Sequence, residues 1–449
     1  MKRFTQAWLI ALTVKTVIAV WLPLSNDESY YWVWGHHPGL SYFDHPPMVG
    51  WLFWLGTFLE SLGNAARLPG VWLGHLTLLI WTKLLAPFLD EKKKLLWLVF
   101  LLASPFFSAG SLIVTPDIPL LFFWSLSLLI LLELVKGKKW AYPALGAALG
   151  LGFCSKYMIV LFVPIALAWL AWSGEWRKIR WALVPVTIVM GLLFCAPVLY
   201  WNYSHDWASF LFQINHGFES EKYKAWWPLE YVGGQLLILF PPLAWLATRR
   251  REPKEAGYLH FFGWLPLAFF LYSSFKAHVE ANWPMMGHPA ILALAFLNMP
   301  NWQWLKASVA IWTLALLIVL SEIAVPWIPI DKRKLKTSEY QRFDVYLPHI
   351  ERAEKEGMPF YLGSYQMAGN LSYKLRRQIY KLGGMNRRDF YDFTPQSYPN
   401  GDKFLVGAEI YHPLPEWLTA KGYVLKNTQI LNSEFVILEV ERRAQGSDR

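Results

Sequence analysis

The stretch FTQAWLIALTVKTVIAVWLPL, residues 4–24, is apolar and long enough to cross a lipid bilayer, and SNDESYYWVW, residues 25–34, follows it directly. A helix needs about 20 apolar residues to cross the hydrocarbon core. The stretch is too long for the core of a signal peptide and no small-residue cleavage pattern follows it, so we interpret it as an uncleaved first span. Asp27 and Glu28 therefore leave this span at membrane depth, among tyrosines and tryptophans.

The composition of the whole chain indicates a polytopic membrane protein. Of the 449 residues, 55% are hydrophobic and only 16% are charged, whereas soluble proteins carry about 25% charged residues. A net charge of +10 would suggest nucleic acid binding in a soluble protein, but here the basic residues form short clusters between apolar runs. Such clusters are a topology signal. The two cysteines lie in or at the ends of apolar segments, so no disulfide framework is expected.

About eleven apolar segments are candidate membrane spans. They are residues 4–24, 67–89, 94–113, 118–135, 140–155, 157–172, 181–200, 229–247, 258–275, 284–298 and 305–326. The basic clusters between them all fall on one side of the membrane if the N-terminus is cytoplasmic, as the positive-inside rule requires. The opposite face then receives acids, histidines and tryptophans, as expected of a reactive surface at the membrane edge.

The predicted organisation has two domains. Residues 1–326 form an all-α membrane domain whose outer loop, residues 25–66, carries the first acidic motif and a short interfacial helix at Met48–Gly63. Residues 327–449 are charged, contain no run long enough to span, and are expected to form a small extracytoplasmic α/β domain. Within it MPFYLGS (358–364) and EFVILEVE (434–441) predict strands, and YQMAGNLSYKLR (365–376) predicts a helix.

Three acids near the outer face are candidates for catalysis. Asp27 and Glu28 begin the outer loop, where acids are favoured as helix caps, but a carboxylate held among apolar rings can also act as a general base. Asp117 lies between two apolar runs in VTPDIPLLFFW, where it can cap the following span or take part in catalysis. The two roles are compatible, because a buried acid at a span end needs a partner in any case.

Basic side chains at the ends of different spans are candidates for binding a phosphate. Lys156 interrupts a long apolar stretch in GFCSKYMIV, and it either marks a tight outer turn or meets an anion at headgroup level. Lys276 and His278 in FKAHVEANWP raise the same choice, as does Arg67 in ARLPG. Cations from separate spans could gather around one phosphate group.

The motif YFDHPP places Asp44 beside His45. It is interpreted either as an ordered turn before the interfacial helix or as a group that orients substrate or binds a divalent metal. Together with His216, these residues are the only metal candidates considered, and the spacing matches no established metal motif. The sequence therefore requires no cofactor, and a divalent metal stays an open alternative.

The chain shows no GxxxxGK[ST] motif, no GxGxxG before a helix and no internal repeat. This argues against a nucleotide-driven pump and against a Rossmann-type nucleotide-sugar site.

Five separated motifs, in order and spacing, give the sequence a specific resemblance. NDESYYWVW…GLSYFDHPPMVGWL, ARLPG, TPDIPLLFFW, GFCSKYMIVLF and KAHVEANWP resemble those of the integral-membrane GT-C glycosyltransferases, in the bacterial branch related to protein O-mannosyltransferases and the lipid A aminoarabinose transferase. The resemblance covers roughly residues 1–300. It implies a polyprenyl-phosphate sugar donor, a periplasmic active site and the bacterial inner membrane.

The same resemblance implies roles for individual residues. Asp27 corresponds to the catalytic carboxylate, Asp117 to the acid before the fourth span, and Asp44 with His45 to the second motif. Members that transfer aminoarabinose usually have an arginine and a lysine where this chain has Tyr30 and His45, which favours a neutral or different sugar. The residues expected to bind or orient substrate are Tyr30, Tyr31, Asp44, His45, Glu280 and Trp283.

The predicted function is inverting transfer of a sugar from the lipid donor to lipid A, lipopolysaccharide core or another envelope glycan. A protein hydroxyl is the alternative acceptor. The rival of another class is a transporter or flippase for a lipid-linked sugar, which would share the spans and the outer charges. Paired halves and broken helices are typical of transporters, and the sequence shows no repeat.

Overall fold

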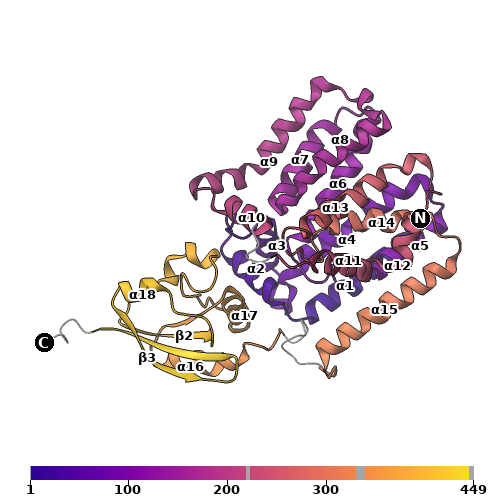
Figure 1. Ribbon diagram of the computed structural model, residues 1–449. Helices are drawn as coiled ribbons and strands as arrows, with labels where there is room; N and C mark the ends of the chain where they lie inside the picture. The colour runs from indigo at the N-terminus through magenta and orange to yellow at the C-terminus, as the bar shows by residue number, and fades with distance from the viewer. Residues whose placement is uncertain (1, 219–222, 330–338, 444–449) are drawn as a thin grey trace. The chain divides into compact units, whose positions relative to one another are not determined.

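The computed structural model describes residues 2–218, 223–329 and 339–443 (Figure 1). The chain divides into two compact units. The first contains residues up to 22 and residues 39–320, and the second contains residues 23–38 and 321–449. The second unit thus combines the C-terminal part of the chain with residues 23–38, which carry the first acidic motif.

The first unit is helical. Five helices are long and apolar enough to cross a membrane among the residues described. They are α1 (Lys2–Trp21), α4 (Leu68–Leu85) with a short turn at each end, α6 (Asp117–Val135), α9 (Val184–Ser204) with the turn before it, and α15 (Trp302–Ala324), whose last residues belong to the second unit. These helices support a polytopic membrane protein.

The other apolar segments form shorter helices. These are α3 (Met48–Thr57), α5 (Glu91–Ala103), α7 (Ala141–Ser155), α8 (Phe162–Ser173), α10 (Ala208–Phe218), α11 (Trp227–Leu239), α12 (Pro241–Ala247), α13 (Tyr258–Ser274) and α14 (His288–Leu297). The predicted span 94–113 ends as a helix at Ala103 because Pro105 forces Ser104 into an extended conformation. The count of eleven spans is therefore not established by helix length.

The predicted span 229–247 is broken in the middle. Helices α11 and α12 meet at an angle of 89°. Phe240 joins them with a φ of 65°, and two prolines follow it. Since proline lacks the amide hydrogen that an uninterrupted helix needs, the chain turns sharply at this point.

Close backbone approach holds α7 against α9. A Cβ atom added at Gly146 would lie 2.1 Å from the carbonyl oxygen of Thr187, and one at Gly150 would lie 2.5 Å from that of Gly191. Small residues four apart permit such contacts between helices in lipid, where burial of apolar surface gives no net driving force. The outward side of α9 is apolar and exposed, as a lipid-facing helix requires.

The second unit is a small α/β fold with a four-stranded sheet. The strand order is β1-β2-β4-β3, with β1 parallel to β2 and the other pairs antiparallel. The strands are β1 (Phe360–Leu362), β2 (Lys403–Glu409), β3 (Tyr423–Ile430) and β4 (Phe435–Arg442), and the helices are α2 (Asn26–His36), α16 (Leu347–Lys355), α17 (Tyr365–Leu375) and α18 (Glu416–Ala420). The predicted α/β character, both predicted strands and the predicted helix are confirmed.

Candidate functional site

A partly buried polar cluster in the first unit is centred on Asp117, the buried first residue of α6. Its carboxylate accepts three hydrogen bonds. Lys156 Nζ donates to Oδ1 at 2.6 Å, Asn282 Nδ2 donates to Oδ2 at 2.7 Å, and Thr115 Oγ1 donates to Oδ2 at 3.3 Å. The cluster joins residues from three of the sequence motifs: TPDIP, GFCSK and EANWP.

Lys156 is the residue at which α7 stops. Its backbone is extended, with a φ of −160°, and a short 3₁₀ turn, Tyr157–Leu161, follows it. Its side chain is 13% exposed and that of Asp117 is 6% exposed, so the ion pair is largely removed from water. Lys156 therefore marks a turn, and the anion that its side chain contacts in the structure is the carboxylate of Asp117. Phosphate binding by Lys156 stays a prediction.

Asn282 was not singled out by the sequence analysis, although it lies in the quoted motif EANWP. It belongs to the segment between α13 and α14. The preceding carbonyl, of Ala281, accepts a hydrogen bond from Gln235 Nε2 at 3.0 Å. An amide side chain gives no hydropathy or charge signal, so only its proximity to a candidate acid could have revealed it.

Lys276, His278 and Glu280 lie on the same segment as Asn282. In the described part of the chain, their ring and ion-pair contacts are with residues other than Asp117. The Lys276 ammonium lies 4.7 Å from the ring centroid of Tyr272. His278 is half exposed and has a carboxylate on each side, since Nε2 is 3.7 Å from Glu230 and Nδ1 is 3.7 Å from Glu280.

Trp283, which follows Asn282, packs edge-on against Phe270 at a centroid distance of 6.0 Å. Asn282 is thus hydrogen-bonded to Asp117, and the ring of Trp283 packs against α13.

Arg67 has a structural contact that the phosphate hypothesis did not anticipate. The side chain is 1% exposed, and Nη1 donates to the carbonyl oxygens of Leu22, at 2.9 Å, and Ala19, at 3.4 Å. These carbonyls end the first span, where a cation also meets the negative end of the helix dipole. Arg67 therefore has a structural contact at the end of the first span, and its binding of a phosphate stays a prediction.

The two acids of the first motif differ in the structure. Ser25 caps α2, and Glu28 completes a capping box in which its Oε2 accepts from Ser25 N at 3.0 Å and its own amide donates to Ser25 Oγ at 3.2 Å. Glu28 is fully buried, whereas Asp27 is partly exposed in the first turn. Glu28 therefore has a structural role in the helix cap, and a catalytic role for it stays a prediction.

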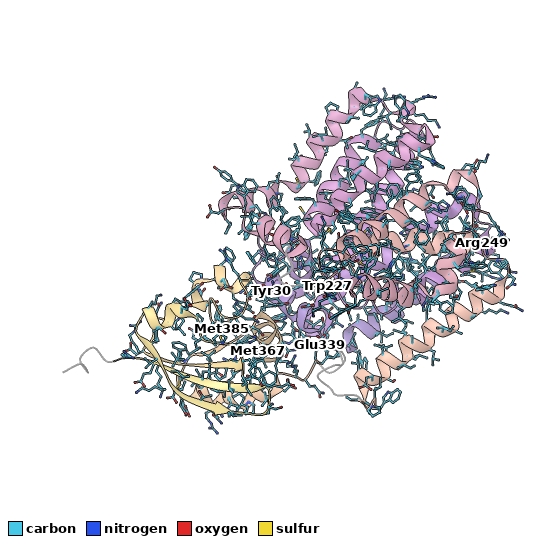
Figure 2. The ribbon with its side chains drawn as sticks, in the orientation of Figure 1. Tyr30, Trp227, Arg249, Glu339, Met367 and Met385 are labelled. Atoms are coloured by element: carbon cyan, nitrogen blue, oxygen red, sulfur yellow. The ribbon has the colours of Figure 1, made fainter. Side chains whose placement is uncertain are left out.

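The C-terminal unit positions α2. Tyr30 is 2% exposed, its hydroxyl accepts a hydrogen bond from Phe390 N at 2.9 Å, and its ring lies 4.6 Å from that of Tyr365 (Figure 2, where Tyr30 is labelled). Asn370 Nδ2 donates to Asn26 Oδ1 at 3.0 Å, and both side chains are buried. Asn26, the residue before Asp27, is thus hydrogen-bonded to Asn370 of α17.

Tyr31 is also part of the aromatic packing of α2. Its ring lies 5.1 Å from that of Trp34 in an edge-on arrangement, and it is 6% exposed. The two tyrosines predicted to orient substrate are thus buried in the second unit.

The motif YFDHPP forms an ordered turn in the first unit. Asp44 is 3% exposed and its backbone carbonyl accepts from Gln213 Nε2 at 2.5 Å. Tyr42 N donates to the carbonyl of His45 at 3.3 Å, which closes the turn. Burial raises the pKa of Tyr42, although a hydrogen bond from the Gly39 amide opposes this effect.

No cluster of three or more metal-ligating side chains is found among the residues described. The side chain of His216 lies outside the described residues.

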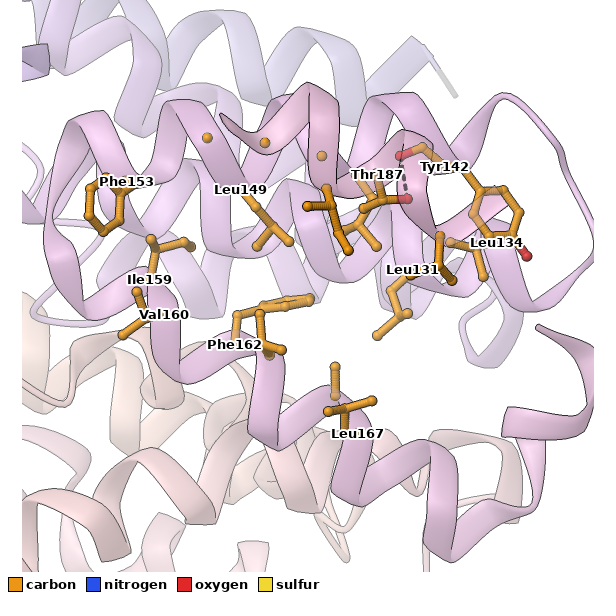
Figure 3. A pocket seen from close by; sticks show the side chains of 18 of the residues that line it. Leu131, Leu134, Tyr142, Leu149, Phe153, Ile159, Val160, Phe162, Leu167 and Thr187 are labelled. Atoms are coloured by element: carbon orange, nitrogen blue, oxygen red, sulfur yellow. Dashed lines mark hydrogen bonds between the residues drawn. The ribbon is translucent and has the colours of Figure 1, made fainter. Parts of the chain in front are cut away.

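An apolar cavity of about 570 Å³ opens between α6, α7, α8 and α9 (Figure 3). Leu149, Phe162 and Leu167 line its middle, and Thr187 is one of its few polar residues. Phe153, Ile159 and Val160 line the part nearest in sequence to Lys156. The walls can hold a hydrocarbon chain, because almost all their side chains are aliphatic or aromatic.

Comparisons with known proteins confirm the resemblance to integral-membrane sugar transferases. Residues 44–201 match the family model described as dolichyl-phosphate-mannose-protein mannosyltransferase. The chain is 24% identical over 311 residues to the lipid A galacturonosyltransferase RgtD of Rhizobium johnstonii, a match that covers 64% of this chain and 63% of that protein. It is 28% identical over 331 residues to the undecaprenyl phosphate-alpha-4-amino-4-deoxy-L-arabinose arabinosyl transferase of Pseudomonas paraeruginosa, covering 65% of this chain and 59% of that protein.

The fold matches solved structures over nearly the whole chain. The crystal structure of ArnT from Cupriavidus metallidurans in the apo state superposes with a TM-score of 0.68, and the form bound to undecaprenyl phosphate with a TM-score of 0.63. Each match covers 97% of both chains, at 17% and 16% identity. The matches to curated relatives span only about one half to two thirds of those proteins.

Proposed function

We propose that this chain is an integral-membrane glycosyltransferase that moves a sugar from a polyprenyl-phosphate donor to an acceptor of the cell envelope. The observation that carries the proposal is the Asp117–Lys156–Asn282 cluster, which lies at the turn after α7, close in sequence to the walls of an apolar cavity. A lipid phosphate needs both features, a fixed cation and a place for its hydrocarbon chain. The names of the similar proteins support the same reaction class.

Lys156 is proposed to neutralise the departing polyprenyl phosphate, assisted by Lys276 and His278. The leaving phosphate is already ionised, so it needs fixed positive charge rather than a proton. Asp117 accepts hydrogen bonds at both oxygens, and we therefore assign it the orientation of Lys156 and Asn282 rather than proton transfer.

Asp27 is proposed as the general base that accepts a proton from the acceptor hydroxyl as its oxygen attacks the anomeric carbon. Direct displacement inverts this carbon. Asp27 is partly exposed, whereas Glu28 beside it is committed to the helix cap. If the acceptor oxygen belongs to a phosphate, which is already ionised, Asp27 orients it instead.

Lipid A or the lipopolysaccharide core is the proposed acceptor, and a protein hydroxyl is the alternative. Tyr30 and His45 stand where aminoarabinose transferases usually carry basic residues, so the proposed sugar differs from aminoarabinose. Tyr30, Tyr31, Asp44, His45, Glu280 and Trp283 remain proposals for substrate contact or its support.

The proposed topology has about eleven spans in a bacterial inner membrane, with a cytoplasmic N-terminus and a periplasmic C-terminal unit. The basic clusters support this orientation, and the short helices require that some spans cross where the bilayer thins or where they pair end to end.

The test is mass spectrometry of envelope glycolipids from cells that carry the wild-type gene, no gene, or Asp27→Asn. General-base assistance contributes about 10²–10⁴-fold in rate, so Asp27→Asn is expected to lose the same sugar increment as the deletion. The matched control is Asp90→Asn, which keeps an N-cap of α5 and should retain the increment. Wild-type levels of the increment with Asp27→Asn would reject the assignment of Asp27.

A lipid-linked sugar transporter is the second candidate, because the break between α11 and α12 is of a kind that transporters use. An assay in vesicles that hold donor lipid in one leaflet distinguishes a transferase from a transporter. A transferase releases free polyprenyl phosphate, whereas a transporter moves the intact donor and releases none.

A further inference from the structure

We propose that Gln235 is a positioning residue that fixes the segment of residues 276–284 so that Asn282 meets Asp117. The proposal rests on the proposed function, because it assigns Gln235 a part in shaping the donor-phosphate end of that site. The hydrogen bonds of Gln235 go to Ala281 and His288. Gln235 therefore acts on Asp117 through the segment that it holds.

Gln235 lies on α11, is 4% exposed and has a partner at each end of its amide group. Its Nε2 donates to the carbonyl of Ala281 at 3.0 Å, and its Oε1 lies 2.7 Å from Nε2 of His288. His288 is fully buried at the start of α14, and its ring lies 4.5 Å from that of Phe106.

The chemistry of these groups fixes the direction of both hydrogen bonds. The carbonyl of Ala281 can only accept, so the NH₂ group of Gln235 must face it. The amide oxygen then faces His288, and the imidazole Nε2 must carry a proton to donate to it. His288 thus carries a proton on Nε2, and the glutamine amide cannot flip without losing the bond to the carbonyl of Ala281.

The anchored segment has little packing of its own at this point. Ala281 and Asn282 are both exposed, whereas the residue that holds Ala281 is buried. Asn282 nevertheless makes a 2.7 Å hydrogen bond to the buried carboxylate of Asp117. The peptide between Ala281 and Asn282 is therefore fixed from one side by Gln235 and from the other by Asp117.

A double-mutant cycle on sugar transfer tests the proposal with full-length protein in detergent, with donor lipid extracted from cells that lack the gene. Gln235→Leu and Asn282→Ala are each expected to lower kcat by roughly ten-fold or more, because each removes a contact that positions the segment beside Asp117. If Gln235 acts through Asn282, the double variant is no slower than Asn282→Ala alone. Multiplied losses in the double variant would overturn the proposal.

The matched control is Tyr231→Phe. Tyr231 lies one turn earlier on α11, is buried, and donates its hydroxyl to the carbonyl of Leu267 at 2.8 Å, away from the anchored segment. This variant loses a hydrogen bond of the same kind and is expected to retain kcat. An equal loss with Tyr231→Phe would show that disturbance of α11 alone explains the effect and would overturn the proposal.

Hydrogen exchange provides a readout that does not depend on activity. Amides of residues 276–284 are expected to exchange faster in Gln235→Leu than in wild type or Tyr231→Phe. Unchanged exchange would reject the anchor. If wild-type protein transfers no sugar, the proposed function fails, while the exchange result still decides whether Gln235 holds the segment.

Discussion

At the scale of single residues, the ion pair of Asp117 and Lys156 is the feature with the clearest energetic consequence. Its N–O distance is 2.6 Å and neither side chain is more than 13% exposed. A buried pair of this kind stabilises little compared with apolar residues, but removal of one partner leaves an uncompensated buried charge. The two residues should therefore behave as a unit in unfolding.

Lys156→Met is expected to lower the free energy of unfolding by about 3–5 kcal/mol, because Asp117 loses its cation. The combined variant Asp117→Leu/Lys156→Met should recover most of this loss. Thermal unfolding in a single detergent measures both. A double variant as unstable as the sum of the two single variants would contradict the pairing.

Glu28→Gln is expected to keep stability and most of the transfer activity. Glutamine can replace glutamate in a capping box, since its side-chain oxygen accepts from the same Ser25 amide. Glu28→Gln removes the charge and keeps the cap, whereas Glu28→Ala removes both. Transfer rates and melting temperatures of the two variants therefore separate the effect of the cap from that of the charge. Complete loss of transfer in a stable Glu28→Gln variant would return Glu28 to the catalytic set.

The sequence could predict the charged members of the cluster but not its amides. Asp117 and Lys156 stand out because a charge inside an apolar run needs a reason. Asn282 and Gln235 carry no such signal. The contact of Arg67 with the end of the first span could not be predicted either, because a sequence cannot distinguish a cation that caps a helix from one that binds a ligand.

At the scale of elements, α2 and α17 form the contact that holds the first acidic motif. A Cβ atom added at Gly369 of α17 would lie 2.9 Å from the backbone nitrogen and Cα of Tyr30. Only glycine permits this approach, and the bond between Asn26 and Asn370 lies beside it. The C-terminal unit is therefore part of what orients Asp27.

Gly369→Ala is expected to destabilise the second unit by about 1–3 kcal/mol through overpacking, less the roughly 1 kcal/mol that alanine gains over glycine in a helix. Gly401→Ala is the matched control, because its nearest neighbour atom would be 3.9 Å away. Hydrogen exchange of α2 amides and transfer rates measure the effect. Equal behaviour of the two variants would contradict the close packing of α17 on α2.

Some elements were predictable from their pattern and others were not. The apolar run in EFVILEVE predicted β4, whose first four residues are all buried, whereas β3 is exposed along most of its length and gives no such signal. The predicted spans 94–113 and 229–247 are interrupted at prolines, where local backbone restrictions outweigh a continuous hydropathy signal.

At the scale of the whole molecule, orientation in the membrane follows from charge. The proposed topology, which rests on the basic clusters and on the resemblance, has the loop around Lys138 in the cytoplasm and the second unit in the periplasm. Tyr411 of that unit is 89% exposed, which makes it suitable for labelling. The native cysteines, Cys154 and Cys195, are both buried.

Tyr411→Cys is expected to react with a membrane-impermeant thiol reagent in spheroplasts, and Lys138→Cys only after the membrane is made permeable. The parent protein supplies the background of the buried native cysteines. Labelling of Lys138→Cys alone in intact spheroplasts would invert the proposed topology.

The central claim is that this chain cleaves the bond between a sugar and a polyprenyl phosphate and transfers the sugar. Its most direct measurement is the amount of polyprenyl phosphate released, and of sugar gained by lipid A, when purified protein meets donor lipid extracted from cells that lack the gene. The account predicts equal amounts of both products with wild-type protein and a loss of about 10²–10³-fold with Lys156→Met. It is contradicted if wild-type protein releases no polyprenyl phosphate, or if Lys156→Met releases it at the wild-type rate.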